Sequence, residues 1–434
     1  MAVATYGIYA LTNAWFISRG VGETAFVAVN LVAPLLLILG AVSTTVGVGG
    51  ASLVSHRLGA GDPRGAARAA GNAFVVFWAA AVLIGGLGIL LIEPLLTVLG
   101  AAGETRAPAR DYALIILAGS LTATGFSSLV RAEGRMRFST LIWVVSVVCQ
   151  IVLDPLLIFG LDMGVRGAAF GTVGGQAVSV GLSLWFFFLQ RDRPYRIGLA
   201  DLRPHGPTLR RLVSLGAPSF LGGLGTTLVT ALANVLLLRL GGAVALSAYA
   251  ICARIGTFAL MPQLGISQGM QPLIGYNAGR ALADRVHRTR VLALRATTLY
   301  GAAACAVLLG AAGPLTGAFT DDPEVRDAAA DGLRVLALGH PLAGVATLVA
   351  AYFQALGRAR PSYLISIGSI VGVRVPLLLL ASLAGTTWLW SSFPVAELVT
   401  AAAAWLILRR RGGAAGGAEA PKERAPARPR TRSP

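Results

Sequence analysis

The chain has 434 residues, of which 55% are hydrophobic and only 13% are charged, and its formal net charge is +17. Soluble domains carry about 25% charged residues, so this composition excludes an ordinary soluble domain and indicates an integral membrane protein. The basic residues lie in short loops and in the C-terminal stretch, with no basic face interleaved with aromatic residues. That distribution argues against nucleic acid as a partner and leaves the lipid bilayer.

Apolar runs separated by charged or Gly/Pro-containing loops predict an all-α membrane protein with twelve transmembrane helices. The expected spans are 2–18, 25–54, 67–92, 110–132, 138–160, 166–190, 211–238, 243–275, 286–313, 327–356, 361–384 and 388–409. The first run is short for a span of about 20 residues. Either neighbouring helices help it to cross, or the true start of the protein lies upstream of Met1.

Arginine-rich loops alternate along the chain with loops that carry few basic residues. The rich loops begin near Arg57, Arg131, Arg191, Arg280 and Arg358, and the tail from Arg409 belongs to the same set. The positive-inside rule places this set in the cytoplasm. We therefore expect a multi-pass protein of the cell membrane with both termini inside.

The two halves of the sequence resemble each other. The segment from Ala28 to Gly59 matches the segment from Ala248 to Gly279 at a constant offset of 220 residues. This pattern predicts two pseudo-symmetric six-helix bundles of the same orientation, because six spans return the chain to its starting side. The expected domains are an N-terminal lobe (1–190), a cytoplasmic linker (191–210), a C-terminal lobe (211–410) and a disordered basic cytoplasmic tail (411–434).

One carboxylate stands deep in an apolar run. Asp154 lies six residues before Gly160, which is about 9 Å from that end of a helix. A charge at such depth costs about 2.5–3.5 kcal/mol unless it faces a partner or a polar cavity, so Asp154 is a candidate functional residue. Pro155 loosens the helix beside it, and Gln150 shares its helix face. We expect a water-filled pocket around this acid.

Several motifs together resemble the multidrug and toxic compound extrusion (MATE) transporters, in particular their prokaryotic DinF-like branch. The motifs are Asn30-Leu-Val-Ala-Pro34, Gly59-Ala-Gly-Asp-Pro63, Arg131-Ala-Glu-Gly-Arg135, Leu153-Asp-Pro-Leu-Leu-Ile158, Gly164-Val-Arg-Gly-Ala-Ala169 and Gln271-Pro-Leu-Ile-Gly-Tyr-Asn-Ala-Gly279. The resemblance covers about residues 6–410. It implies two six-helix bundles in a V shape and efflux of drug-like organic compounds against a proton or sodium gradient.

The resemblance also implies a coupling network in the N-terminal lobe. By position, its tyrosine matches Tyr9, its helix-five acid matches Asp154 and its threonine matches Thr172. Two positions depart from the pattern, because Asn13 replaces an acid and Gln150 replaces an asparagine. Since Asn13 cannot titrate, Asp154 would carry the proton alone. The alternative is that Asp154 only caps a broken helix or accepts hydrogen bonds without titrating.

Four further polar groups lie in the predicted C-terminal spans: Glu397, Arg374, Arg254 and His340. A pair between Glu397 and Arg374 would satisfy both charges inside the membrane. One interpretation is that these residues form a second ion or substrate site. The alternative is that Glu397 and Arg374 form a structural ion pair, that His340 is a buried core residue, and that Arg254 is satisfied by other groups. Metal-ligand spacing and catalytic motifs are absent from the sequence, so we expect no metal site, no cofactor and no enzyme activity.

The sequence as a whole predicts a monomeric, cation-coupled antiporter that exports organic small molecules, amphipathic or cationic, by alternating access. Protons are the first choice of coupling ion, and sodium is the alternative because a carboxylate with amide and hydroxyl oxygens also suits a hard cation. The runner-up is a lipid-linked precursor flippase of the same wider superfamily. Such a flippase would line its cavity with several arginines, and only Arg254 and Arg374 are expected to lie deep in the membrane.

Overall fold

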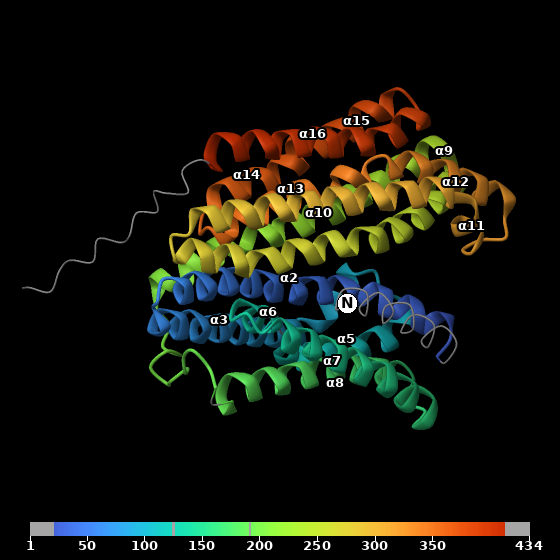
Figure 1. Cartoon of the computed structure of the whole chain (residues 1–434). Helices are drawn as coiled ribbons and strands as arrows, with labels where there is room; N and C mark the ends of the chain where they lie inside the picture. The colour runs from blue at the N-terminus through green and yellow to red at the C-terminus, as the bar shows by residue number, and fades with distance from the viewer. Residues whose placement is uncertain (1–20, 124–125, 191, 413–434) are drawn as a thin grey trace, which may run out of the picture.

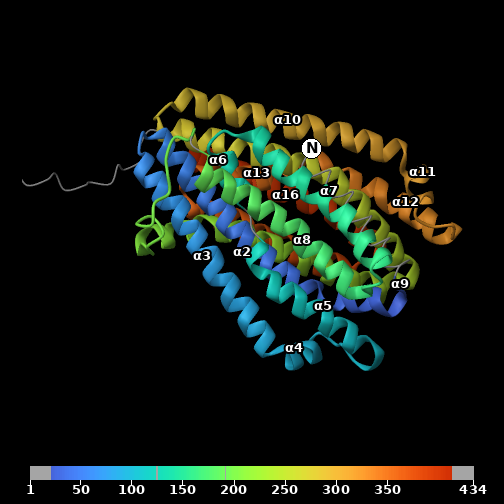
Figure 2. The same cartoon turned by 90° about the horizontal axis from the view of Figure 1, so that it is seen from below.

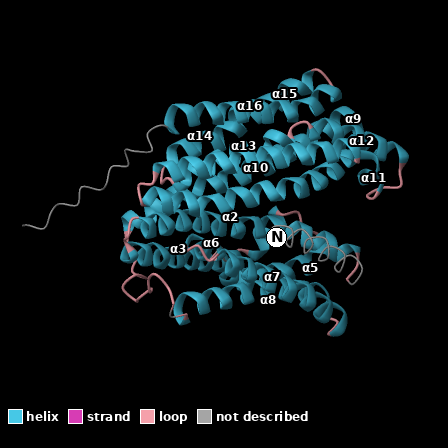
Figure 3. Ribbon diagram, in the orientation of Figure 1, coloured by secondary structure: helices cyan, strands magenta, loops and turns pink. Residues whose placement is uncertain are grey.

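The computed structural model describes residues 21–123, 126–190 and 192–412, and in these ranges every regular element is a helix (Figure 3). Helices satisfy their own backbone hydrogen bonds, as lipid requires. The predicted helix 2–18 lies outside the described residues, and so does the predicted tail from residue 413 onward.

The helices form two groups, which Figure 1 shows one above the other. The N-terminal group contains α2 (Glu23–Gly59), α3 (Pro63–Leu90), α4 (Ile92–Val98), η1 (Gly103–Thr105), α5 (Arg106–Ala118), η2 (Gly119–Thr122), α6 (Ser127–Ala132), α7 (Met136–Pro155), η3 (Leu156–Gly160), α8 (Gly164–Leu184) and η4 (Trp185–Leu189). The C-terminal group contains α9 (Gly206–Gly279), α10 (Ala283–Gly310), α11 (Ala312–Gly317), α12 (Pro323–Ala337), α13 (His340–Ala355), α14 (Ala359–Ser369), η5 (Ile370–Arg374), α15 (Val375–Leu383) and α16 (Thr386–Gly412). Helix α2 runs along the boundary and packs against α9.

The predicted spans are recovered with a few differences. In the described ranges nine helical stretches are long and apolar enough to cross a membrane, and α12 with α13 forms a tenth that is bent by 52°. The 74-residue α9 covers two predicted helices, 211–238 and 243–275, which meet at a kink where Gly242 has φ 67°. Glycine permits this left-handed conformation. The short helices α4 and α11, which the sequence did not predict, follow the ends of α3 and α10 (Figure 2).

The internal repeat is visible in the backbone. Gly134 and Gly357, which occupy matching places in the two halves, have φ angles of 81° and 74°. Gly61 and Ala281, which are related by the 220-residue offset, have φ angles of 72° and 57°. The second half therefore repeats a left-handed turn even where an alanine must adopt it, at a cost of about 1–2 kcal/mol.

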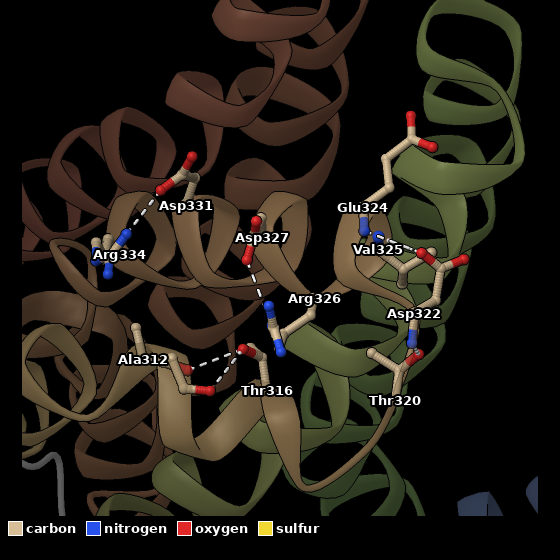
Figure 4. A network of polar contacts seen from close by, with 11 residues as sticks. Ala312, Thr316, Thr320, Asp322, Glu324, Val325, Arg326, Asp327, Asp331 and Arg334 are labelled. Carbon is tan, nitrogen blue, oxygen red and sulfur yellow. Dashed lines mark hydrogen bonds and ion pairs between the residues drawn. The ribbon is translucent and has the colours of Figure 1, made fainter.

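The two ends of the helical bundle differ in charge. At the basic end lie the turns 60–62, 133–135, 280–282 and 356–358 and the segment 192–205, where Arg135 donates a 2.6 Å hydrogen bond to the Asp192 carbonyl. At the opposite, acidic end, Glu93 pairs with two arginines, and the hydrogen bond from Arg106 lowers the pKa of the Glu93 carboxyl. Also at this end, the Asp322 carboxylate caps α12 by accepting from the backbone N–H of Glu324 at 2.9 Å (Figure 4).

The segment between the lobes is tied to the N-terminal lobe by a buried ion pair. Arg193 pairs with Glu133, and their side chains are 1% and 0% exposed. The Arg193 guanidinium also lies over the rings of Phe187, at 4.5 Å, and Tyr195, at 4.7 Å. Burial, with the charge of Glu133, raises the pKa of the Tyr195 phenol well above its usual value. Such enclosure fixes the start of the linker in one position.

Candidate functional site

Asp154 lies where α7 packs closely against α8. Its side chain is 1% exposed, and it precedes the π-helical turn η3 that follows Pro155. A Cβ added to Gly171 would meet Asp154 Oδ1 at 2.0 Å, and one added to Gly175 would meet Gln150 Cβ at 2.9 Å. Gln150 and Asp154 lie one turn apart on α7, and Gly171 and Gly175 lie one turn apart on α8. Because glycine has no side chain, the two glycines leave space for the acid and the amide.

Thr172 and a residue that the sequence analysis missed complete the described surroundings of this acid. The Thr172 hydroxyl donates to the Ala168 carbonyl at 3.1 Å. Tyr112 of α5 is 3% exposed, and its phenol lies close enough to Thr172 and to Asp154 to interact with both. The aromatic residue at the start of the apolar run after Asp111 was the only sequence signal for Tyr112. The other expected partners, Tyr9 and Asn13, lie outside the described residues, so the predicted wet pocket stays a prediction.

The predicted pair in the C-terminal lobe is confirmed. Arg374 Nη2 lies 2.7 Å from Glu397 Oε1, with side chains 24% and 19% exposed. Arg374 ends the π-helical turn η5, and Glu397 comes from the middle of α16. A Cβ on Gly339 would lie 3.2 Å from Glu397 Cγ, so the carboxylate packs against the break between α12 and α13.

The other two predicted members of this site are not joined to that pair. His340 is 7% exposed and its Nδ1 lies 3.3 Å from the Leu336 carbonyl, across the break between α12 and α13. Its carbonyl accepts from Gln263 Nε2 at 3.0 Å, which ties α13 to α9. Arg254 is exposed on α9. These contacts favour the structural interpretation of His340, and none of the described ion pairs joins Arg254 to Glu397.

A cavity of about 310 Å³ lies between α2 and the C-terminal lobe. Its lining combines small apolar residues with hydroxyl and amide groups, among them Ser267 and Gln268, and Arg374 is its only charged residue in the part of the chain that is described. At one wall Gln354 of α13 is bound to α9 at two places. Its Nε2 donates to Ser219 Oγ at 2.8 Å, and its Oε1 accepts from Gln271 at 3.0 Å. The cavity therefore offers hydrogen bonds and one cation to a small molecule.

Toward the basic end, α2 and α9 approach without intervening side chains. A Cβ on Gly49 would lie 2.0 Å from the Leu212 carbonyl oxygen, and one on Gly216 would lie 1.8 Å from the Thr45 carbonyl oxygen. We call this close approach, together with the contact described next, the seam. Backbones this close leave no passage between the helices at that level.

The seam continues with a reciprocal contact. A Cβ on Gly59 would lie 2.0 Å from the Tyr276 carbonyl oxygen, and one on Gly279 would lie 2.2 Å from the His56 carbonyl oxygen. The four residues are related in pairs by the 220-residue offset, so the pseudo-twofold axis passes through this contact. The seam closes the space between the lobes at the basic end.

The family model MatE matches residues 1–156 and 218–380 of this chain. The chain belongs to the MatE family. It is therefore a membrane transporter and not an enzyme, and the resemblance to MATE transporters is confirmed. Its assignment to the DinF-like branch stays a prediction.

Similar proteins span nearly the whole of this MatE chain. It is 28% identical over 397 residues to the multidrug export protein MepA of Staphylococcus haemolyticus, covering 91% of this chain and 87% of that protein. It is 27% identical over 417 residues to MepA of Staphylococcus aureus, covering 92% and 88%. The similarity therefore extends over most of the length of each protein.

Solved structures share the fold. An outward-facing multidrug resistance MATE family transporter superposes with a TM-score of 0.90 at 24% identity, covering 95% of this chain and 93% of that one. A transporter of the MOP superfamily from Pyrococcus furiosus, described as having a binding pocket of reverse polarity, superposes with a TM-score of 0.89 at 24% identity, covering 96% and 94%. The likeness shows that this MatE chain has the two-lobed, all-helical membrane fold that the sequence predicted; of the twelve expected helices, the first lies outside the described residues.

Proposed function

We propose that this protein exports drug-like organic small molecules by alternating access, in exchange for a coupling cation. The observation that carries the proposal is the cavity between the lobes, which is closed by the seam at the basic end. A site that is sealed on one side of the membrane is one of the two states that alternating access requires. Support also comes from the staphylococcal relatives, which are named multidrug export proteins.

The basic end faces the cytoplasm in this proposal, which follows the positive-inside rule. Both termini then lie in the cytoplasm and the protein resides in the cell membrane. With the seam closed at that end, the described conformation faces outward. The protein works as a monomer, because each chain carries both lobes and the cavity between them.

The substrate binds in the cavity between α2 and the C-terminal lobe. Its polar lining accommodates varied hydrogen-bonding groups, and its apolar patches receive the hydrophobic parts of amphipathic compounds. The described lining contains no carboxylate, so it gives no support to a preference for cations. It also gives none to a lipid-linked precursor flippase, for which several arginines around the cavity were expected and only Arg374 is found.

Asp154 carries the coupling cation, with protons as the first choice and sodium as the alternative. Two features support this role. The acid is buried near the hydroxyl groups of Tyr112 and Thr172, and Pro155 with η3 interrupts the regular helix at that point. Coupling requires only that the substrate affinity differ between the loaded and unloaded forms of Asp154.

The test is efflux from proteoliposomes that contain the purified protein, with proton and sodium gradients imposed separately. We expect a proton gradient to drive export of a dye in the wild type, and Asp154→Asn to abolish the gradient dependence while downhill exchange continues. Gradient-driven export that is unchanged in Asp154→Asn would rule out the coupling role. Export driven by sodium alone would replace the proton by the alternative ion.

A further inference from the structure

A second cavity, of about 280 Å³, opens at the basic end and shares no described lining residue with the cavity between the lobes. Its walls come from the end of α2, the turn before α3, the start of α3 and the segment that leads into α9. The charged or titratable residues that line it are Arg57, Arg64, Arg68, Arg211, Asp62 and His205. Four guanidinium groups therefore meet around one small space.

The single carboxylate of this basic pocket is already engaged. Asp62 Oδ1 accepts from the Gly65 backbone N–H at 2.7 Å, which caps α3, and Asp62 Oδ2 lies 2.9 Å from Arg57 Nη1. The ion pairs of the described residues include none that involves Arg64, Arg68 or Arg211. Three positive charges around the pocket thus lack a counter-charge from the described protein.

One wall of the pocket is held rigidly by a buried amide. Asn72 on α3 is 0% exposed, and its Nδ2 donates to the carbonyls of Asp201 at 3.1 Å and Arg203 at 3.3 Å. Its Oδ1 accepts from the His205 backbone N–H at 2.8 Å. The segment that carries His205 is therefore fixed against α3, and the pocket is a preformed site rather than a gap beside a loose loop.

We propose that this basic pocket binds a phosphate monoester. Arginine forks match phosphate oxygens, and a dianion suits a site with three uncompensated charges. The first turn of α9, which includes the lining residues Pro207 and Thr208, adds the partial positive charge of a helix N-terminus beside the same space. The positive-inside rule explains arginines at this end of the bundle, but it does not explain why four of them converge on one pocket.

Two sources present this chemistry at a membrane surface. One is an anionic lipid with a monoester headgroup, which basic pockets at the membrane edge take up. The other is a soluble phosphate compound of the cytoplasm. Either ligand would bridge α3 of the N-terminal lobe and Arg211 of the C-terminal lobe.

The position of the pocket gives binding a consequence for conformation. Arg211 precedes Leu212, which meets Gly49 in the seam, and Arg57 is two residues from Gly59. When the seam opens, Leu212 leaves Gly49 while Asn72 still holds His205 against α3, so Arg211 moves relative to α3. A phosphate that bridges Arg211 and α3 therefore binds the closed seam more tightly than the open one. Ligand binding therefore shifts the population toward the closed seam.

The experiment measures binding and needs no transport, so its outcome is independent of the proposed export function. Full-length protein in nanodiscs of phosphatidylcholine is titrated with phosphatidic acid, a monoester, or phosphatidylglycerol, a diester, and bound lipid is counted by native mass spectrometry. Inorganic phosphate and pyrophosphate serve as soluble competitors. The test variant is Arg64→Gln/Arg68→Gln, and the control is Arg285→Gln/Arg288→Gln, which removes two exposed arginines of α10 at the same end.

We expect phosphatidic acid to bind the wild type at least 10-fold more tightly than phosphatidylglycerol, with this preference lost in the test variant and kept in the control. Competition by pyrophosphate at micromolar concentration would support the soluble source, and its failure to compete would support the lipid source. Equal losses in the test and control variants, or equal affinity for the two lipids, would overturn the proposal, because both results describe diffuse attraction to a basic surface. Spin labels across the seam should report fewer open molecules when phosphatidic acid is present.

Discussion

The seam makes a sharp prediction, because Gly49→Ala adds one methyl group where no space exists. Its Cβ would lie 2.0 Å from the Leu212 carbonyl oxygen, which is 1.4 Å short of the 3.4 Å at which ordinary contact begins. The neighbour is backbone and cannot rotate away, so α2 and α9 must separate. Overpacking of this kind costs about 1–3 kcal/mol. The cost falls on the closed seam alone, so the open form should gain roughly 5- to 150-fold in relative population.

The measurement is a double electron–electron resonance distance across the basic end, between labels at Arg137→Cys and Arg285→Cys, both exposed in the described structure. The three native cysteines are first replaced by serine. The control is Gly40→Ala on the same helix, where an added Cβ meets nothing within 4 Å. We expect a longer distance to gain population only in Gly49→Ala, together with slower efflux. Identical distance distributions in both variants would refute the idea that close backbone contact holds the lobes together.

Three further changes test other parts of the structure. Gly171→Ala would place a Cβ 2.0 Å from Asp154 Oδ1 and should reduce gradient-driven efflux, whereas Gly181→Ala, which meets nothing within 4 Å, should not; equal rates in proteoliposomes would contradict this. Arg374→Met leaves the Glu397 carboxylate without its cation and should lower the thermal unfolding midpoint. The loss in free energy of unfolding should be smaller than the roughly 3–5 kcal/mol of a fully buried pair, because the side chains are 24% and 19% exposed. Adding Glu397→Met should restore part of that stability, and a double variant no more stable than the single one would be evidence against the pair. Asp322→Ala removes the cap of α12 and should cost about 0.5–2 kcal/mol in the same assay, while Asp321→Ala should change little.

Features that arise from a charged residue within an apolar run could be predicted from the sequence. Asp154 was expected at membrane depth beside a break in its helix, and it stands directly before Pro155 and η3, because a carboxylate and a proline leave few alternatives within an apolar run. The Arg374–Glu397 pair was expected for the same reason, since two deep charges on nearby helices must compensate each other. Both inferences use local chemistry and need no knowledge of the packing.

Features that depend on contacts between distant segments were missed. Arg193 was interpreted as one of several loop charges, yet it is buried against Glu133, 60 residues away. The glycines of α8 gave a general signal for close packing, but only the structure shows that Gly171 faces Asp154. The span predicted as one helix over 327–356 is bent by 52° between α12 and α13, where Gly339 lies against Glu397. Hydropathy cannot detect such a bend, because it reports how apolar a segment is and not the direction of its axis.

The repeat places opposite charges near the related prolines Pro155 and Pro376, which indicates different roles for the two lobes. Asp154 directly precedes Pro155 in the N-terminal lobe, whereas Arg374 comes two residues before Pro376, the matching proline of the C-terminal lobe. Arg374 lines the cavity between the lobes and Asp154 is not among its lining residues. A cation held at Asp154 and a substrate held near Arg374 would therefore not compete for the same atoms.

The sites at Asp154 and Arg374 can be coupled only through an element that contacts both and that changes position between the two conformations. Helix α2 meets this requirement, because Thr44 lines the cavity, Gly49 lies in the seam, and α2 also packs against α5, which carries Tyr112 beside Asp154. A change of charge at Asp154 that alters the packing of α5 on α2 would bias the seam, and the seam decides which side of the membrane the cavity faces. Exchange thus needs no direct contact between cation and substrate, provided that each binds the two positions of α2 with different affinity.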